Sequence, residues 1–416
     1  MANHLKPSLL ILLCAATIVV ESAQLESSYK KKKYFSSSYY PRPQDFPNEG
    51  LYKAYFVIQR FKHTITCDPR NITGTWTGPD ICGKKSYDGF YCSAPSGHAQ
   101  DLTVTSIIFD GFGLCAPKLQ GFIDQLPYVA LFQGTSNTFG GDIPRLNGLP
   151  YMYSPMIKDD ASPRHCSYLN AASICLPPST GPNVIHKAQE ISGATNAKAL
   201  LLNNNNLSGT LPANLGFSKV SYLALANNKL TGPIPPSIAH MQDSLLEVLL
   251  LSNQLSGCLP HELGMLTKTS VIDAGMNQLA GPIPSSFSCL SSVEQLNLAG
   301  NRLYGQVPDA LCNLAGPAGR LANLTLSSNY FTSVGPACSA LIKDGVLDMK
   351  RNCIPGFANQ RGPAECASFL SQPKTCPASS ARVACPAADA KKNAPTPEGR
   401  VAREYSSYVT YATLHE

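Results

Sequence analysis

Hydrophobic and polar positions recur along this chain in one fixed order. From about residue 200 to 360 the sequence repeats L-x-L-x-x-N-x-L-x-G-x-x-P, as in LLLNNNNLSGTLP from Leu200 and VLLLSNQLSGCLP from Val248. Neighbouring copies of the asparagine lie 23 to 28 residues apart, a period that predicts units stacked into a solenoid. These asparagines are Asn205, Asn228, Asn253, Asn277, Asn301, Asn329 and Asn352.

Each repeat carries residue types that suit one coil of such a solenoid. The L-x-L element predicts a short strand whose two leucines point inward, where neighbouring coils shield them from water. The asparagine can bond backbone groups left unpaired where the strand ends, so its copies should form a ladder. The Gly and the I-P or L-P step predict a turn and a short convex helix. We therefore expect an α/β solenoid of plant-type leucine-rich repeats, with short parallel concave strands and disulfide-bonded N- and C-terminal caps.

The pattern is weaker upstream of residue 200. We assign residues 98–352 to repeats, and FQGTSNTFGGDIP from Phe132 fits one of them, with Asn137 in the ladder position. Residues 151–198 would hold about two more repeats by length, but they do not follow the pattern. They indicate either a loop-rich insertion or eroded repeats, because they contain a Pro-Pro step and two cysteines, Cys166 and Cys175.

The two ends of the chain differ from the repeats in composition. Residues 1–22 predict a signal peptide, because the apolar run from Leu9 to Val20 is too short to cross a bilayer. No later run is longer, so we expect an exported protein without a transmembrane segment. Residues 23–48 predict a disordered basic leader rather than an arm for acidic polymers. Residues 378–416 predict a disordered tail.

Cysteine usage agrees with export to an oxidising compartment. The chain has 15 cysteines, and 14 remain once Cys14 leaves with the signal peptide, an even number typical of a disulfide set. No two cysteines stand in a CxxC pair, which disfavours a zinc site. The formal net charge is +6, but the expected compartment excludes nucleic acid as a partner.

A solenoid needs caps, because its end coils would otherwise expose the apolar column. Residues 49–97 predict the N-terminal cap, and residues 353–377 predict the C-terminal cap. The N-terminal cap begins with an amphipathic stretch that contains Ala54, Phe56, Val57, Ile58 and Phe61. Four cysteines lie in or beside the C-terminal cap, and the sequence leaves their pairing open: Cys338, Cys353, Cys366 and Cys376.

Several motifs carry a family resemblance. The W-x-G-x-x-x-C element from Trp76 to Cys82, closed by Cys92, resembles the N-terminal cap of plant leucine-rich repeats, which implies a Cys82–Cys92 disulfide. Residues 50–377 are similar to the repeat portion of the plant leucine-rich repeat extensin family. Three further motifs carry this resemblance: YKAYFVIQRFK, GFIDQLPYVALFQGTSNTFGGDIP and NCIPGFANQRGPAECASFLSQP. The long Ser-Pro-Pro-Pro-Pro runs of that family's tailed members are missing here, so we expect a tailless relative without covalent wall anchoring.

The sequence shows no catalytic constellation. It has no HExxH, no G-x-S-x-G elbow and no phosphate-binding glycine loop, so we expect neither an enzyme nor a cofactor or metal. The candidate binding surface is the concave sheet, where residues that alternate with the strand leucines point outward. The residues predicted to bind a ligand there are Tyr222, Glu247, Leu249, Asp273, Met276, Asn297, Thr325, Asp348 and Lys350.

The predicted face is apolar at its middle and acidic toward its C-terminal end. Acidic positions suit a basic peptide better than anionic pectin. Three N-x-S/T sequons predict N-glycosylation, at Asn71, Asn206 and Asn323. Asn206 should point outward, whereas a glycan on Asn323 would restrict access to one end of the sheet.

The resemblance implies a secreted protein of the plant cell wall or apoplast. It implies capture of small basic cysteine-rich peptide hormones of the rapid-alkalinisation type, with a role in wall assembly and growth. One alternative is an inhibitor of secreted pectinases, because polygalacturonase-inhibiting proteins share the period and the L-x-G-x-I-P pattern. Another is a structural wall protein in contact with wall polysaccharide. A homodimer is left open.

Overall fold

The structure is a computed structural model that describes residues 41–94, 101–146, 149, 198–316, 319–376, 385, 408–412 and 414. The predicted signal peptide, most of the basic leader and the stretch 150–197 with Cys166 and Cys175 lie outside these residues. The described residues from Pro43 onward belong to one unit.

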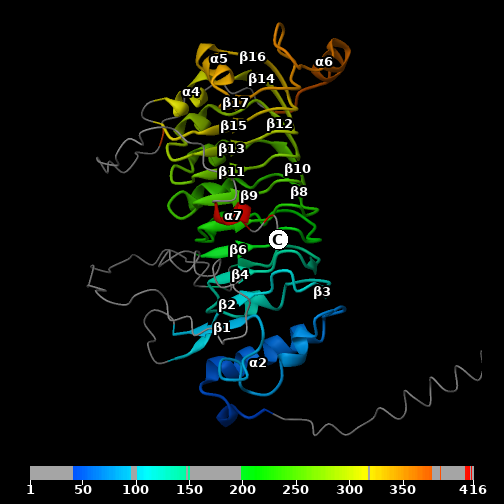
Figure 1. The fold of residues 1–416 in the computed structure, drawn as a ribbon, viewed down its shortest axis with the longest axis vertical. Helices are drawn as coiled ribbons and strands as arrows, with labels where there is room; N and C mark the ends of the chain where they lie inside the picture. The colour runs from blue at the N-terminus through cyan, green and yellow to red at the C-terminus, as the bar shows by residue number, and fades with distance from the viewer. Residues whose placement is uncertain are drawn as a thin grey trace, which may run out of the picture. The chain divides into compact units, whose positions relative to one another are not determined.

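A ten-stranded sheet crosses all the repeats in the described part of the chain (Figure 1). From β2 onward each strand pairs in parallel with that of the next repeat, and only β1 and β2 are antiparallel. This main sheet confirms the concave strands of a plant-type leucine-rich-repeat solenoid. Its strands, in order, are β1 (Phe90–Ser93), β2 (Thr103–Ile108), β4 (Leu131–Gln133), β6 (Ala199–Leu201), β7 (Tyr222–Ala224), β9 (Glu247–Leu249), β11 (Val271–Asp273), β13 (Gln295–Asn297), β15 (Asn323–Thr325) and β17 (Leu347–Asp348).

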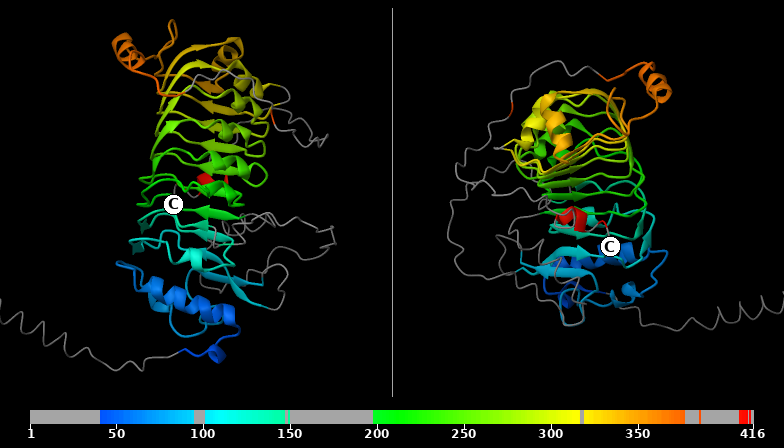
Figure 2. Two further views of the ribbon diagram at one scale, coloured as in Figure 1. Left: turned by 180° about the vertical axis from the view of Figure 1, so that it is seen from behind. Right: turned by 45° about the horizontal axis from the view of Figure 1, so that its top comes forward.

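The strands of a second, five-stranded sheet follow five of the ladder asparagines, which are Asn228, Asn253, Asn277, Asn301 and Asn329. Figure 2 shows the same stack in two further views. Its strands pair in parallel: β8 (Thr231–Gly232), β10 (Gln254–Cys258), β12 (Gln278–Gly281), β14 (Arg302–Val307) and β16 (Tyr330–Val334). A two-stranded pair, β3 (Cys115–Ala116) and β5 (Thr138–Phe139), lies nearer the N-terminus.

Short helices complete the repeats, as the I-P and L-P steps predict. Extended prolines, Pro235, Pro260 and Pro284, directly precede three of them. The helices are η3 (Ile123–Gln125), η5 (Leu215–Phe217), η6 (Pro236–Met241), η7 (His261–Met265), η8 (Ser285–Cys289), α4 (Asp309–Cys312), η9 (Asn313–Ala315) and α5 (Pro336–Lys343).

The repeated asparagines form the predicted ladder. The side-chain oxygen of Asn253 accepts a hydrogen bond of 3.0 Å from the backbone N–H of Leu230 in the preceding repeat. Its amide donates to the carbonyl oxygens of Leu225 at 2.9 Å and Leu250 at 3.1 Å. Asn137 makes the same kinds of bonds, which confirms its ladder position. Because each asparagine joins two coils, the ladder belongs to the scaffold and not to a binding site.

The main sheet has no strand between β4 and β6. Leu131 pairs directly with Ala199, and Phe132 with Leu200. The expectation that residues 151–198 hold about two repeats concerns a stretch that, up to residue 197, lies outside the described residues.

The N-terminal cap rests on helix α2 (Glu49–Lys62). Asn48 caps the helix, because its side-chain oxygen accepts a hydrogen bond of 2.9 Å from the N–H of Leu51. The apolar face of α2 is buried as predicted, except that Phe56 is exposed. A 3₁₀ turn, η1 (Pro43–Asp45), precedes it, and Phe46 is buried against the helix. The end of the predicted disordered leader is thus ordered. A second 3₁₀ turn, η2 (Ile72–Thr75), lies before buried Trp76.

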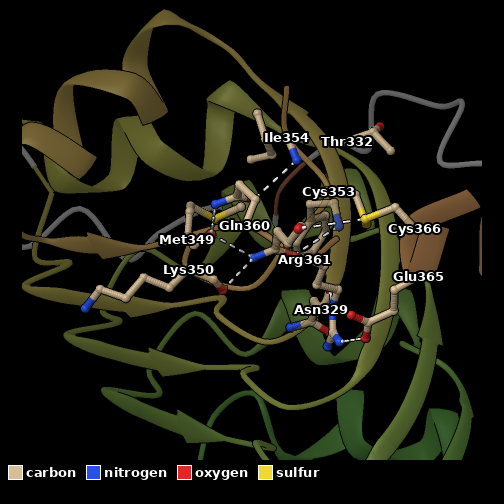
Figure 3. Close-up of a disulfide and its surroundings, with 12 residues drawn as sticks. Asn329, Thr332, Met349, Lys350, Cys353, Ile354, Gln360, Arg361, Glu365 and Cys366 are labelled. Carbon is tan, nitrogen blue, oxygen red and sulfur yellow. Dashed lines mark hydrogen bonds and ion pairs between the residues drawn. A yellow bond between two sulfur atoms is a disulfide. The ribbon is translucent and has the colours of Figure 1, made fainter. Parts of the chain in front are cut away.

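The C-terminal cap contains helix α6 (Pro363–Leu370) and is closed by the Cys353–Cys366 disulfide (Figure 3). Arg361 joins this cap to the repeats, since its Nε donates a hydrogen bond of 2.7 Å to the carbonyl oxygen of Asn329. Its guanidinium lies over the Tyr330 ring, 4.3 Å from the centroid, and pairs with Glu365. Phe369 of α6 stacks on the same tyrosine at 3.6 Å.

Six disulfides join described cysteines. Cys82–Cys92 confirms the pairing that the family resemblance implies. Of the cysteines whose pairing the sequence leaves open, Cys353 bonds Cys366 within the cap and Cys338 bonds Cys312 within the repeats. Cys376 of the cap bonds Cys258 of the repeats. The remaining two are Cys67–Cys115 and Cys289–Cys385.

The prediction of a disordered tail from 378 to 416 is wrong for its last part. Residues Val409–Ala412 form a short helix, α7, which lies against the main sheet beside β7 and β9 (Figures 1 and 2). The reason is specific contact with strand side chains, which composition alone does not reveal.

Candidate functional site

The strands of the main sheet present alternate residues to its two faces. In β7, Leu223 belongs to the apolar column, whereas Tyr222 and Ala224 lie on the outer, concave face. Leu249 in β9 lies on this outer face too. The structure therefore places these predicted surface residues on the expected side of the sheet.

The middle of this face is nevertheless buried. Tyr222, Ala224 and Leu249 belong to a second apolar cluster, which also contains Tyr408 and Tyr411 from the C-terminal segment. The expectation of a solvent-exposed face is thus wrong here, because a segment far away in the sequence packs on it.

Glu247 is the main polar contact of α7. This residue of β9 is only 6% exposed. Its carboxylate accepts hydrogen bonds from the N–H of Val409 at 3.2 Å and from the N–H of Thr410 at 2.7 Å. The Thr410 hydroxyl donates to the same carboxylate at 2.9 Å. One strand side chain thus binds two backbone groups and a hydroxyl of the segment.

Asp273 lies one repeat later, at the end of β11, where it pairs with Leu249 of β9, and is 1% exposed. Its carboxylate accepts hydrogen bonds from the Tyr411 hydroxyl, from the N–H of Gly275 at 2.9 Å and from the Asn297 amide at 3.0 Å. The buried carboxylate is therefore satisfied from the tail, from its own turn and from the next repeat.

Three further residues hold the ends of the segment. The Tyr408 hydroxyl donates to Glu294 at 2.9 Å, next to β13. The Asn203 amide donates to the carbonyl oxygen of Thr410 at 3.2 Å, and that of Asn204 to the carbonyl oxygen of Leu414 at 2.9 Å. The repeat pattern does not mark Glu294, Asn203 or Asn204 as binding residues. The signal that could have suggested a partner for them is the YSSYVTY stretch near the C-terminus.

The electrostatics of the site follow from this burial. Desolvation raises the pKa of the Glu247 carboxyl, although the hydrogen bonds from Thr410 and Val409 act in the opposite direction. Desolvation also raises the pKa of Asp273, against the bonds from Tyr411, Gly275 and Asn297. Burial, and then the charge of Glu247, raises the pKa of Tyr222. The site is thus acidic, water-poor and rich in hydrogen-bond acceptors.

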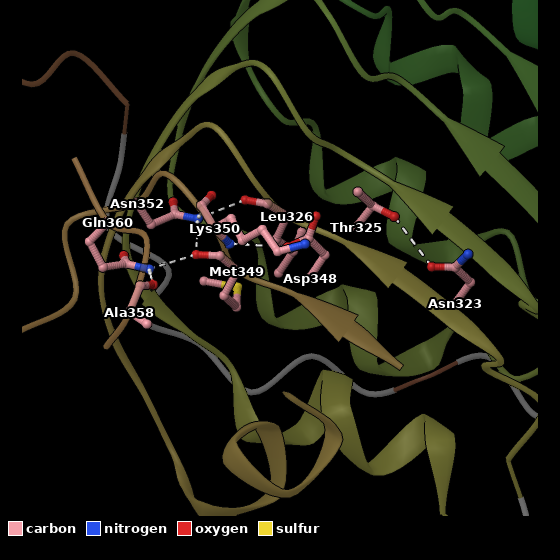
Figure 4. A network of polar contacts seen from close by, with 9 residues as sticks. All are labelled: Asn323, Thr325, Leu326, Asp348, Met349, Lys350, Asn352, Ala358 and Gln360. Atoms are coloured by element: carbon pink, nitrogen blue, oxygen red, sulfur yellow. Dashed lines mark hydrogen bonds and ion pairs between the residues drawn. The ribbon is translucent and has the colours of Figure 1, made fainter. Parts of the chain in front are cut away.

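The other predicted binding residues lie toward the C-terminal end of the sheet or at its edge (Figure 4). The Thr325 hydroxyl bonds Asn323 at 3.3 Å, and Lys350 forms an ion pair with Asp348 at 3.9 Å, largely exposed. Met276 is 59% exposed at a left-handed corner after β11, so it does not belong to a strand. The structure brings Tyr222, Glu247, Leu249, Asp273 and Asn297 together and leaves the others apart from them.

The three sequons occupy different settings. Asn71 and Asn206 are exposed, and Asn206 points outward as expected. Asn323 is half-buried at the start of β15.

Away from this face, a cavity of about 340 Å³ lies beside α2, with Arg60, Lys118 and Phe122 in its lining. No cluster of His, Cys, Asp or Glu that could hold a metal ion occurs among the described residues. Within the same residues, no helix has the length and apolar character needed to span a membrane.

Comparison with known proteins agrees with the repeat architecture. The family model described as Leucine Rich Repeat matches residues 219–241 and 292–314. Leucine-rich repeat extensin-like protein 6 of Arabidopsis thaliana is 33% identical over 335 residues, which cover 79% of this chain and 68% of that protein. Leucine-rich repeat extensin-like protein 1 of the same plant is 35% identical over 99 residues, 24% of this chain and only 13% of that relative's length.

A solved structure shows the same kind of fold. It is the leucine-rich-repeat ectodomain of the Arabidopsis thaliana receptor kinase GASSHO1/SCHENGEN3 in complex with CASPARIAN STRIP INTEGRITY FACTOR 2. The TM-score is 0.50 at 24% sequence identity, with 72% of this chain and 33% of that chain covered. At this identity the likeness concerns the fold alone.

Proposed function

The chain belongs to the leucine-rich repeat extensin-like family, and on this basis we propose that it is a secreted protein that captures a peptide on its concave face. The supporting observation is that a peptide segment, residues 408–412 of the chain itself, already lies there. Glu247 bonds the backbone of that segment as well as a side chain. A surface that accepts hydrogen bonds from a segment's backbone N–H groups has the main property required of a peptide-binding site.

The chemistry of the face indicates which peptides it would take from outside. Glu247, Asp273 and Glu294 place three carboxylates along three successive repeats, and Asp348 adds a fourth toward the C-terminal end. Such a row complements Lys and Arg side chains and repels polyanions such as pectin. We therefore propose a small basic cysteine-rich peptide of the rapid-alkalinisation type as the ligand class.

The setting belongs to the same proposal. Disulfides persist in oxidising compartments, and the six found here support an extracellular protein. We place it in the cell wall or apoplast, with a role in wall assembly and growth, and with glycans on the exposed Asn71 and Asn206. We do not extend the proposal to a pectinase or a homodimer, because no contact of the described residues favours either.

Calorimetric titration with a panel of basic peptides of the rapid-alkalinisation type tests the ligand class. The chain is titrated both intact and shortened to end at Arg403, because its own C-terminal segment lies on the same face. We expect a Kd of about 1 μM or tighter for at least one peptide. Glu247→Gln should weaken it about tenfold, since a hydrogen bond to a charged group contributes roughly 1.5–3 kcal/mol.

Asp243→Lys is the matched control. Asp243 is an exposed carboxylate beyond η6 that forms an ion pair with Lys268 at 3.5 Å. Its reversal should leave the Kd unchanged. Absence of binding by both forms of the chain, across the whole panel, would reject the proposed ligand class.

A further inference from the structure

We propose that residues 408–412 are an internal ligand. The concave face is then a site for an uncharged, hydroxyl-bearing peptide segment, and the chain fills it with its own C-terminal segment. An external ligand that uses the same carboxylates must first displace this segment. Only this last step rests on the proposed function. Occupation by the chain's own segment stands on the contacts described above.

The recognition uses three hydroxyls and three carboxylates. Tyr408 bonds Glu294, Thr410 bonds Glu247 and Tyr411 bonds Asp273. The three acceptors come from the successive repeats of β13, β9 and β11, so the segment crosses the stack instead of following one strand. Phe or Val in place of the donors would keep the apolar contacts and leave buried carboxylates with fewer bonds, which is costly. The site therefore selects for hydroxyl groups rather than for apolar character alone.

The segment has a defined direction. Tyr408 lies at the β13 end, and Leu414 lies over the turn after β6, where the Asn204 amide bonds its carbonyl oxygen. The side-chain NH2 of the neighbouring Asn203 donates a hydrogen bond to the carbonyl oxygen of Thr410. The side-chain oxygen of Asn203 accepts a hydrogen bond from the N–H of Ala226. Because the hydrogen bond from Ala226 in the next repeat holds the Asn203 side chain in place, Asn203 is preorganised to bind the backbone of the segment.

The connection to the repeats makes internal occupation favourable. The Cys289–Cys385 disulfide attaches the chain to η8, one helix before β13. Only about twenty residues separate Cys385 from Tyr408, and linkers of this size give effective concentrations on the order of 1 mM. If the free segment binds with a Kd of about 10 μM, the intact site is about 99% occupied, and an external competitor loses about 100-fold in apparent affinity.

The test uses a synthetic peptide of residues 404–416 and two forms of the protein, the intact chain and the chain that ends at Arg403. We expect the shortened chain to bind the peptide at least tenfold more tightly than the intact chain does. A peptide that carries Thr410→Val and Tyr411→Phe should bind the shortened chain at least tenfold more weakly, because it keeps the shape and lacks two donors. Equal binding of the first peptide by both chains, or equal binding of both peptides, would overturn the proposal.

Two more measurements distinguish internal occupation from exchange of segments between copies and from failure of the proposed ligand class. Light scattering should give a monomer for the intact chain, and a dimer that dissociates on truncation would show exchange of segments between copies and reject internal occupation. Titration of both chains with the basic peptides of the proposed function completes the test. If neither chain binds them while the synthetic peptide behaves as expected, the proposed ligand class fails and the internal ligand stands. If both chains bind them equally, the displacement step fails.

Discussion

The hydroxyl group of Tyr411 donates a hydrogen bond to the carboxylate of Asp273, 138 residues earlier in the chain. The contact brings the C-terminal segment onto the strand position that the repeat pattern marks as the centre of a binding face. Because Asp273 is almost fully buried, its carboxylate depends on such donors in place of water.

Tyr411→Phe should loosen the C-terminal segment without unfolding the repeats. The substitution keeps the ring in the apolar cluster and removes one donor to a buried carboxylate, at a cost of about 1.5–3 kcal/mol. Amide hydrogen exchange of residues 408–412 should accelerate roughly ten- to a hundredfold. Tyr52→Phe in α2 is the control and should leave that exchange unchanged. Unaltered exchange in Tyr411→Phe would mean that the hydroxyl contributes nothing to the attachment.

The attachment of the segment should weaken as pH rises. Burial raises the pKa of Glu247 and of Asp273 while the segment is bound, and release into water would return both toward their ordinary values of about 4. The bound form then takes up protons more readily than the released form. Binding is therefore strongest below the ordinary values and declines as pH rises through the raised ones. Groups that face the two carboxyls are Tyr222, Glu294, Asn297, Thr410 and Tyr411.

Exchange of residues 408–412 measured from about pH 4 to about pH 7, and corrected for intrinsic rates, checks this direction. The double variant Glu247→Gln, Asp273→Asn should show a much flatter dependence. Protection that increases with pH in the unaltered chain would contradict the assignment.

Asn277→Ala should destabilise the repeats strongly. Asn277 accepts the N–H of Leu255 at 3.0 Å and donates to the carbonyl oxygens of Leu250 and Gly275 at 3.0 and 2.9 Å. Its loss leaves buried backbone groups in two coils unpaired, at a cost of about 3 kcal/mol. Denaturant unfolding followed by circular dichroism measures the change. The adjacent, exposed Gln278 is the control, and Gln278→Ala should stay within about 0.5 kcal/mol of the parent.

Arg361→Lys should weaken the C-terminal cap despite the retained charge. The guanidinium donates a hydrogen bond to a backbone carbonyl, pairs with Glu365 and lies over the Tyr330 ring, and an ammonium group cannot do all three. We expect a loss of about 1–2 kcal/mol and faster proteolysis within residues 353–376. Arg302→Ala, at an exposed position of β14, should change neither quantity. If the cap of Arg361→Lys resists proteolysis as well as that of the parent, the positive charge alone is enough to hold the cap.

The repeat scaffold could be predicted from the sequence because its determinants are local. The leucines and the ladder asparagines recur at a fixed spacing, so one coil explains the next, and Asn137 could be assigned even where the pattern weakens. The stretch 151–198 could not be resolved in this way. Its residues do not repeat at a fixed spacing, so a loop-rich insertion and eroded repeats both stay predictions.

The candidate site was predictable only in part, for the opposite reason. Strand alternation correctly places Tyr222, Leu249 and Asp273 on the outer face. Their burial depends on contacts with residues more than 130 positions away in the sequence, and the repeat periodicity does not predict such contacts. Met276 was misassigned because its left-handed backbone turns it out of the sheet at the corner. The disulfide between Cys376 of the cap and Cys258 of the repeats also joins residues far apart in the sequence.

The Cys258–Cys376 disulfide, with a sequence separation of 118, also affects which end of the solenoid unfolds first. A linear array ordinarily frays from either end, one unit at a time. Here the last repeats and the C-terminal cap lie inside a closed covalent ring, and the Cys289–Cys385 ring overlaps it. Frayed units in this half stay tethered and gain little chain entropy, so they should melt together as one block. The N-terminal half has only short covalent loops in its described part, and disorder should therefore enter the molecule from that side.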